Sequence, residues 1–367
     1  MKTLLYQDWD TLSRQYDWVA DMADTPQDPR HHAEGNVAVH TQMVLQALVA
    51  LPGYKALPQT ERDILWTAAL LHDVEKRSTT FTEADGSIVS PGHAKKGSRT
   101  ARQLLYTGFG TPFAVREQIA GLVRYHGLPL WLMHKPDPQK YLLEASFGVN
   151  TEWLALLARA DVLGRICADK EELLERIDFF EAYCREQECW GEPRVFANER
   201  ARFHYFRTEH ASPVYVPFDD STCEVVLLSG LPGMGKDHYI RAHHPQLPVI
   251  SLDAIRQKHK LDPKDRWANG FVAQEAKEQA RVCLRAGQGF LWNATNITKQ
   301  MRSQLVDLFA TYKARVTIVY IERPYPVWLK QNAAREEALP RAALFKMLQK
   351  LEVPAPTEAT SVIYQSD

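Results

Sequence analysis

A glycine-rich stretch that could bind phosphate lies in the second half of the sequence. It contains Gly230, Gly233 and Gly235, and Lys236 follows at once. Glycines let the backbone curl so that successive N–H groups point at phosphate oxygens, and a terminal lysine can reach the outer phosphates. The stretch follows the apolar run EVVLLS and precedes a helical segment, which is the context such a loop requires. We therefore expect these four residues to bind ATP or another nucleoside triphosphate.

The residue after this lysine departs from the usual pattern. Loops of this kind normally carry Ser or Thr there as a Mg²⁺ ligand, whereas this sequence has Asp237. A carboxylate can bind Mg²⁺ directly or through water. Asp237 is therefore a candidate cofactor-binding residue, with an altered metal geometry.

A carboxylate and a guanidinium follow the next expected strand, VISLD. Asp253 and Arg256 are three residues apart and would share one face of a helix that begins there. Near bound phosphates, Asp253 could accept the proton of an attacking hydroxyl while Arg256 steadies a phosphate. A helix-capping Asp with a surface Arg is the simpler alternative.

Other polar residues of this half are weaker candidates. Asn293, Thr295 and Asn296 end a third expected strand, at the edge where open α/β sheets bind ligands, although turn chemistry also explains them. Arg323, Lys330, Arg335 and Arg341 lie in an expected helical stretch that Pro340 breaks, as expected of a lid that closes cations over ATP. A solvated basic face explains any one of them equally well.

The first half of the sequence contains a second set of chemically capable residues. They are histidines and aspartates in or at the ends of expected helices: His40, His72, Asp73, His93, His126 and Asp161. Imidazole and carboxylate bind divalent metals, and two such ions together can activate water and grip a phosphoryl oxygen. One histidine alone is usually a hydrogen-bonded core residue, but six residues of these types are harder to explain in that way.

Lys76 is a candidate catalytic residue close to these ligands. It lies four residues after His72, and on one continuous helix the two would share a face. Lys76 could then touch a substrate phosphate. A surface ion pair with Glu75 explains it equally well.

The elements that must position these residues differ between the halves. From about residue 36 to 210 the pattern is helical, with Asn36 as one expected cap and Thr60 with Asp63 as a capping box. Beyond residue 222, short apolar runs alternate with helical stretches, which predicts a parallel sheet covered by helices. Residues 211–222 read as a linker. We predict an all-α domain in residues 1–214 and an α/β domain in residues 223–367.

Composition and charge narrow the possible partners. The net charge is −1, yet residues 223–367 carry 20 Lys and Arg against 14 Asp and Glu, so a polyanion would prefer this half. The five cysteines form no CxxC pair, which argues against a disulfide framework. No apolar stretch is long enough to span a membrane, and Asp8 interrupts the start before a signal core develops. We expect a cytoplasmic protein with no membrane contact.

The second half resembles the 5'-OH polynucleotide kinase domains of nucleic-acid repair. The resemblance covers residues 223–356 and rests on the loop, the Asp253 and Arg256 pair, the NATN and Asn332-x-x-Arg335 motifs, and a downstream LExP. It implies that Lys236 binds ATP phosphates, Asp253 is the general base, Arg256 contacts the acceptor phosphate and Arg335 clamps ATP. Gln331 stands where that family often has a second lid arginine.

The order of ligands in the first half resembles the HD superfamily of metal-dependent phosphohydrolases. The resemblance implies two divalent transition metal ions, such as Mn, Ni or Co. We assign His40, His72, Asp73 and Asp161 to one ion and His93 with His126 to the other, with Asp73 shared. His32 and His134 match no position of the pattern. The stretch HAEGNVAVH is also similar to the HD domains attached to some tRNA nucleotidyltransferases.

Both halves together resemble the bacterial HD-Pnk family. This implies an RNA end-healing enzyme: a 2',3'-cyclic phosphodiesterase and 2'-phosphatase joined to an ATP- and Mg²⁺-dependent 5'-OH polynucleotide kinase. Its partners would be RNA, and conceivably DNA, ends and a separate RNA ligase. Two alternatives stay open: an HD nucleotidase fused to a nucleoside or small-metabolite kinase, and a regulatory module in which an inactive HD domain senses a nucleotide.

Overall fold

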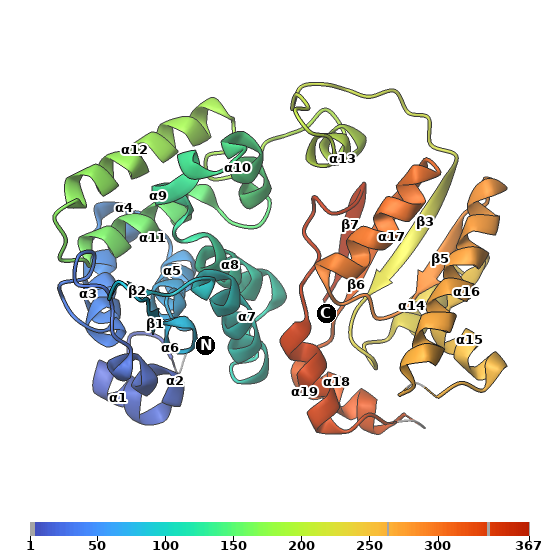
Figure 1. Cartoon of the computed structure of the whole chain (residues 1–367), viewed down its shortest axis with the longest axis horizontal. Coiled ribbons are helices and arrows are strands. Elements are labelled where there is room, and N and C mark those ends of the chain that lie inside the picture. The colour runs from blue at the N-terminus through green and yellow to red at the C-terminus, as the bar shows by residue number, and fades with distance from the viewer. Residues whose placement is uncertain (1–3, 263, 336–337, 367) are drawn as a thin grey trace. The chain divides into compact units, whose positions relative to one another are not determined.

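The structure is a computed structural model that describes residues 4–262, 264–335 and 338–366. It divides into two compact units, Met1–Val195 and Phe196–Asp367 (Figure 1). The division lies before the boundary predicted near residue 214, because one further helix, α13 (Glu199–Arg207), belongs to the second unit. Tyr205 of α13 is buried, and Arg202 donates from Nη2 to the carbonyl of Thr360 at 2.9 Å. Residues 211–222, the predicted linker, contain no helix or strand.

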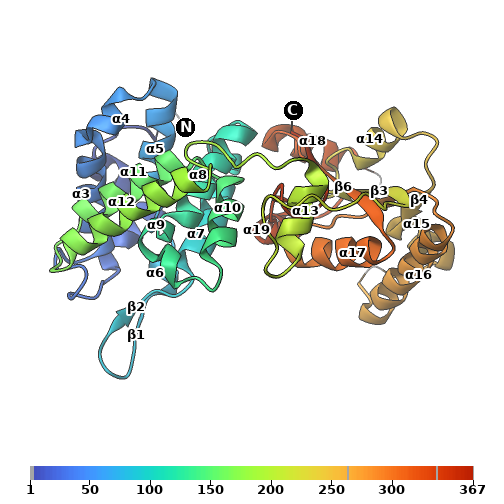
Figure 2. The ribbon, with the colours of Figure 1, turned by 90° about the horizontal axis from the view of Figure 1, so that it is seen from above.

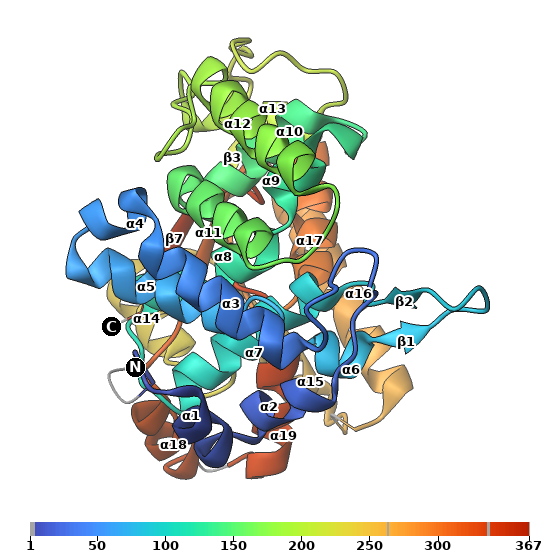
Figure 3. The same cartoon turned by 90° about the vertical axis from the view of Figure 1, so that its left-hand side faces the viewer.

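The first unit is helical, as the sequence predicted. Its longest helices, α3, α5, α7, α8, α11 and α12, enclose an apolar core (Figure 3). The elements are α1 (Trp9–Gln15), α2 (Asp17–Ala20), η1 (Asp21–Asp24), α3 (Val37–Ala50), α4 (Pro52–Ala56), α5 (Gln59–Leu71), α6 (Lys76–Thr79), β1 (Phe81–Thr82), β2 (Ile88–Val89), α7 (His93–Thr107), α8 (Phe113–Tyr125), α9 (Leu128–Trp131), η2 (Leu132–His134), α10 (Pro138–Ser146), α11 (Thr151–Leu163) and α12 (Lys170–Glu186).

Local signals in this unit were right in one place and wrong in others. Asn36 caps α3 by accepting a hydrogen bond from the Val39 N–H at 3.0 Å. Helix α5 instead begins at Gln59 without a side-chain cap, so Thr60 lies inside it. The hairpin β1–β2, which projects from the helices of its unit (Figures 2 and 3), has strands too short for an alternating pattern to reveal.

The second unit is built on a five-stranded parallel sheet, which confirms the predicted α/β arrangement. Its strand order is β4-β5-β3-β6-β7. The first strand of this unit, β3, is therefore central, and the loop that follows it opens at the middle of the sheet edge. After α13 the elements are β3 (Cys223–Ser229), α14 (Lys236–His243), β4 (Val249–Ser251), α15 (Leu252–His259), α16 (Arg266–Arg285), β5 (Phe290–Asn293), α17 (Lys299–Thr311), β6 (Ala314–Ile321), α18 (Tyr325–Ala333), α19 (Arg341–Lys350) and β7 (Ser361–Gln365).

Apolar side chains on one face of this sheet pack against helices α15, α16 and α17. Val225 and Val316 of the sheet pack in one cluster with Ile255, Val272 and Val306 of these helices. Figure 2 shows α14 and α18 on the opposite side of the sheet. The parallel pairing of β3 with β5 and of β5 with β4 places the carboxyl ends of these three strands in one row.

A helix that spans a membrane must be both long and apolar. Among the described residues, no helix meets both requirements.

Candidate functional sites

The six predicted metal ligands lie together in the helical unit. His40 lies on α3, His93 begins α7 and Asp161 lies on α11, whereas His72 is the C-cap of α5, Asp73 follows it and His126 is the C-cap of α8. Two groups of three could each hold a metal ion: His40 with His72 and Asp161, and Asp73 with His93 and His126. In each group the ligand atoms lie within 4.8 Å of one another. The two groups contain the six residues assigned from the sequence, and Asp73 also approaches the first group, with Oδ2 3.3 Å from His72 Nε2 and 3.8 Å from His40 Nε2.

Each histidine is held through its Nδ1 nitrogen, and the partner is an acceptor. Nδ1 of His72 lies 2.7 Å from the carbonyl oxygen of Ala69, and the same bond holds His93 to Ser90 at 2.7 Å. Nδ1 of His126 lies 2.9 Å from the Val123 carbonyl oxygen.

Nδ1 of His40 has a carboxylate partner instead, Glu34 Oε1 at 2.9 Å. A carbonyl or carboxylate oxygen can only accept, so Nδ1 carries the proton in all four histidines. In the neutral imidazoles the Nε2 lone pair is then available as a metal ligand.

These Nε2 atoms face one another or other acceptors. His72 Nε2 lies 3.4 Å from His40 Nε2, and His40 Nε2 lies 3.1 Å from Asp161 Oδ1. Nε2 of His93 and His126 are 3.3 Å apart, and both approach Asp73 Oδ1, a buried atom without a hydrogen-bond partner. Converging acceptors repel unless a cation lies among them. The donor set therefore fits divalent metal ions.

The electrostatics of the site favour a cation. Burial lowers the pKa of His126 to about 3, and the nearby His93 and His72 add to the shift, so His126 stays neutral. Burial also lowers the pKa of His72, but Asp73 outweighs it and the pKa is raised. For Asp73, burial raises the pKa, and Lys76 and His72 overcome it and hold the pKa well below its usual range. Carboxylates that favour a proton on His72 would equally favour a metal ion in its place.

Glu34 is a functional candidate that sequence reasoning missed. Its buried carboxylate accepts from Nδ1 of His32 at 2.8 Å and His40 at 2.9 Å, and from the Ile166 N–H at 2.8 Å. Burial raises its pKa, but these bonds hold the pKa well below its usual range. Glu34 therefore fixes the proton position on a metal-ligand candidate. Its place six residues before His40 was the available signal.

Asp161 has a similar support. Arg165, one helical turn later, donates from Nε to Oδ1 at 3.0 Å and from Nη2 to Oδ2 at 2.5 Å. Burial raises the pKa of Asp161, whereas Arg165 and His40 lower it well below the usual range. Asp161 is thus an ionised carboxylate within the first ligand group.

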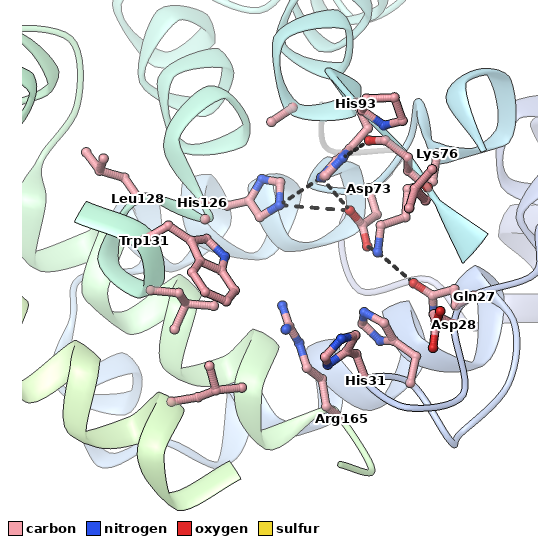
Figure 4. Close-up of a pocket in the computed structure, with 18 of the residues that line it drawn as sticks. Gln27, Asp28, His31, Asp73, Lys76, His93, His126, Leu128, Trp131 and Arg165 are labelled. Atoms are coloured by element: carbon pink, nitrogen blue, oxygen red, sulfur yellow. Dashed lines mark hydrogen bonds and ion pairs between the residues drawn. The ribbon is translucent and has the colours of Figure 1, made fainter. Parts of the chain in front are cut away.

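A pocket of about 820 Å³ opens over the second ligand group. Asp73, His93 and His126 line it, together with Lys76 and Arg165 (Figure 4). Nζ of Lys76 lies 2.8 Å from Asp73 Oδ2 and 2.6 Å from Gln27 Oε1. Lys76 therefore faces the ligand group as predicted.

The reason given for the position of Lys76 was wrong. Helix α5 ends at Leu71, and Lys76 begins the separate α6, so a turn places it beside Asp73. Glu75 points to other partners, Thr100 and Lys96, at 2.7 and 3.0 Å. The surface ion pair between Glu75 and Lys76 does not form.

In the second unit the glycine-rich loop lies between β3 and α14, as predicted. Gly233 and Gly235 have φ of +79° and +92°, which favour glycine. A Cβ on Gly230 would collide with the carbonyl oxygen of Ile321 on β6. The loop conformation thus depends on all three glycines.

Lys236 begins α14 and folds back on the loop. Its Nζ donates to the carbonyls of Gly230 and Leu231, both at 3.0 Å. Burial lowers the pKa of Lys236 to about 8, Asp237 and Asp253 raise it, and Arg335 lowers it. These carboxylates and Arg335 therefore lie within electrostatic range of the loop. Asp237 itself accepts from Asn293 Nδ2 at 2.9 Å, so the exposed carboxylate is held at the ends of β3 and β5.

Asp253 and Arg256 meet as an ion pair. Arg256 Nη1 lies 2.5 Å from Asp253 Oδ1, and Nη2 donates to Asn269 Oδ1 at 3.2 Å. The helix cap is Ser251, which accepts from the Ala254 N–H, so Asp253 is no cap. Its side chain is 83% exposed and open to an incoming hydroxyl group.

The other polar residues at this edge divide by role. Asn296 is buried with φ of +44°, and its Nδ2 donates to the Leu228 carbonyl at 2.7 Å. It therefore stabilises the turn, as the alternative interpretation predicted. The Thr295 carbonyl accepts from the Gly230 N–H at 2.9 Å and supports the loop through its backbone. Only Asn293 of the three places its side chain on a candidate site residue, Asp237.

Of the cations predicted to form a lid, Lys330 lies on α18, Arg335 follows this helix and Arg341 begins α19. Trp328 Nε1 donates to the Pro232 carbonyl at 2.8 Å, which ties α18 to the phosphate loop. Asn332 bonds to both the N–H and the carbonyl of Leu339, at 3.2 and 3.0 Å, and Arg335, three residues after Asn332, is exposed. Lys330 and Arg341 are exposed as well.

Comparisons with known proteins concern the second unit. Residues 225–354 match a family model described as an AAA domain. An L-seryl-tRNA(Sec) kinase of Methanococcus maripaludis is 21% identical over 142 residues, which are 35% of this chain and 53% of that protein. The chain thus spans about half the length of this curated relative.

Two solved structures resemble part of the chain at low similarity. A sugar kinase from a Janibacter species has 18% identity and a TM-score of 0.30, over 39% of this chain and 85% of that one. A gluconokinase from Sinorhizobium meliloti has 14% identity and a TM-score of 0.28, over 40% and 83%. From the family match and the curated relative, the second unit is a P-loop domain with homology to kinases.

Proposed function

We propose that the chain is a bifunctional RNA end-healing enzyme. The helical unit would remove 2',3'-cyclic phosphate and 2'-phosphate groups, and the P-loop unit would phosphorylate 5'-OH ends. The observation that carries the proposal is that one chain contains two separate clusters: six converging acceptor side chains that could hold metal ions, and a glycine-rich loop with an exposed carboxylate, Asp253, nearby.

In the helical unit, the first ion would bind His40, His72 and Asp161, and the second Asp73, His93 and His126. Bound divalent metal ions would supply an activated water and stabilise charge on phosphoryl oxygens. Lys76 would add a positive charge at the pocket wall, where its Nζ already lies 2.8 Å from Asp73.

In the P-loop unit, the loop N–H groups and Lys236 would bind the ATP phosphates, with Mg²⁺ near Asp237. Asp253 would accept the proton of the 5'-hydroxyl, and its exposure leaves it accessible. The bond from Arg256 fixes this carboxylate, and rotation of Arg256 toward an acceptor phosphate would free it for proton transfer. Arg335 would close on ATP from the lid region.

A kinase for a nucleoside or small metabolite is the second candidate, because a P-loop does not define its acceptor. The exposure of Asp253 leaves it accessible to small and large acceptors alike. The proposal of an RNA acceptor is supported by one relative, which is named as an L-seryl-tRNA(Sec) kinase.

The acceptor is tested with γ-labelled ATP and two acceptors, a 5'-OH oligoribonucleotide and a mixture of mononucleosides. We expect label only in the polymer, and no label with Lys236→Ala or Asp253→Ala. Labelled mononucleosides with an unlabelled polymer would instead establish the metabolite kinase.

The phosphoesterase is tested on an oligoribonucleotide with a 2',3'-cyclic phosphate end. We expect conversion with Mn²⁺, Ni²⁺ or Co²⁺, and loss of conversion in His72→Ala and Asp73→Ala. Full activity of these folded variants would rule out the assigned ligands.

A further inference from the structure

Trp131 lines the pocket of the helical unit beside a metal-ligand candidate. It ends the short helix α9, five residues after His126. A Cβ on Gly127 would lie 3.7 Å from Trp131 Cδ1, so the indole packs against the residue that follows this ligand. Figure 4 shows the indole on the His126 side of the pocket, across from Lys76.

The indole is held from outside the pocket but is not buried. The guanidinium of Arg176 lies 4.8 Å from the ring centroid, and Arg176 is itself bound by Glu172 Oε1 at 2.6 Å. Even so, Trp131 is 45% exposed. An aromatic ring fixed by its own protein and still exposed can stack on a ligand with little loss of conformational freedom.

The surroundings suit a nucleoside more than a plain phosphate ester. Leu128, Leu130 and Leu173 line the same pocket, and so does Tyr141, a second aromatic residue that is 43% exposed. A phosphate near Asp73, His93 and Lys76 needs none of this apolar surface. The base of a nucleotide would use this surface, because bases stack on aromatic rings with little dependence on sequence.

We infer that Trp131 is the base-binding residue of this pocket, on which the nucleobase of the terminal nucleotide stacks while its phosphate lies at the metal-ligand groups. The inference rests on the proposed phosphoesterase activity and deepens it. It states that the site selects nucleotides over other phosphate esters and accepts any of the common bases.

The test compares two substrates of the full-length protein: adenosine 2',3'-cyclic phosphate and ethylene phosphate, a cyclic phosphodiester without a base. For Trp131→Ala we expect KM for the nucleotide to rise by about 5- to 100-fold, the range for loss of one stacked base. KM for ethylene phosphate should stay unchanged. Trp131→Phe should retain part of the preference.

Trp190→Ala is the matched control. Trp190 lies in the same unit with an arginine, Arg185, 4.8 Å from its ring, and it is not among the pocket-lining residues. It should leave both KM values unchanged. An equal rise for both substrates in Trp131→Ala, or no change for either, would overturn the inference.

Failure of the proposed function gives a different result. If the wild-type protein hydrolyses neither substrate, the phosphoesterase assignment fails by itself. Calorimetric measurement of the binding of adenosine 2'-phosphate and of inorganic phosphate then tests Trp131 alone. Trp131→Ala should weaken the binding of the nucleotide only. Equal weakening of the binding of both, or no change for either, would overturn the inference.

Discussion

The proton on each histidine decides what the helical unit can bind. Three backbone carbonyls and Glu34 hold the Nδ1 protons, which leaves four Nε2 atoms as acceptors. The candidate ligands thus have their proton positions fixed by Glu34 and by backbone carbonyls, groups that are not themselves candidate ligands of either group.

Glu34→Gln tests the proton position on His40. An amide can offer its N–H₂ to His40 and permit the wrong tautomer, so we expect metal affinity to fall by about 10- to 100-fold. Metal content after dialysis against a graded chelator series measures it.

Glu75→Gln is the control for Glu34→Gln. Glu75 is also a buried carboxylate, but its bonds go to Ser78, Thr100 and Lys96 rather than to a candidate ligand. Equal metal loss in both variants would show that general destabilisation, not the tautomer of His40, is responsible.

Lys236 gives the P-loop unit a pH dependence. Burial lowers its pKa from 10.5 to about 8, and only the protonated amine attracts phosphate. ATP affinity should therefore fall as pH rises through about 8, well below the range where an ordinary lysine titrates. Titrations of ATP binding between pH 7 and 10 measure it.

Lys236→Arg should bind ATP with an affinity that does not change over this range, because arginine stays charged. A wild-type affinity that stays constant to pH 10 would contradict the assigned role of Lys236.

The sequence predicted the site residues unevenly. The six candidate ligands could be named from the sequence because their residue types carry the chemistry, and the structure brings them together in two groups. Glu34 was missed because its role exists only once α3 brings His40 beside it. Asn296 was grouped with Asn293, since sequence position alone could not show that one amide faces the loop backbone and the other Asp237.

At the level of elements, the contact between α3 and α11 sets the first ligand group. Gly164 caps α11 three residues after Asp161, and a Cβ there would lie 2.8 Å from the backbone nitrogen of Val44 on α3. Backbone atoms cannot yield as a flexible side chain can. The distance of 3.1 Å from His40 to Asp161 depends on this close approach.

Gly164→Ala should separate the two helices. We expect a loss of about 1–3 kcal/mol in the free energy of unfolding, with lower metal content and phosphoesterase activity and an unchanged kinase activity. Thermal unfolding and both assays measure it.

Gly270→Ala is the control for Gly164→Ala. Gly270 lies within α16, where an added Cβ meets nothing within 4 Å. It should be neutral or stabilising by about 0.5–1 kcal/mol. A Gly164→Ala protein with normal metal content would contradict the proposed dependence on helix contact.

The element types were predictable because apolar periodicity differs between helices and strands, and the parallel sheet followed from strands that alternate with helices. The ends of the helices and strands were less predictable from the sequence. The turn that separates α5 from α6 and the assignment of α13 to the second unit depend on tertiary contacts, such as that of Arg202 with Thr360.

At the scale of the whole molecule, the two sites lie in separate compact units. The metal-ligand candidates all precede residue 196, and the P-loop candidates all follow residue 222. Each set has its own supporting contacts within its unit. The two activities should therefore be separable by mutation.

The most direct test uses one oligoribonucleotide that carries a 5'-OH and a 2',3'-cyclic phosphate, with mass spectrometry of both ends. The wild-type protein should phosphorylate the 5' end and open the cyclic phosphate. Asp73→Asn should change only the 5' end, and Lys236→Ala only the 3' end. If either folded variant lost both reactions, or the wild-type protein left either end unchanged, the account of two independent phosphate-handling sites would be contradicted.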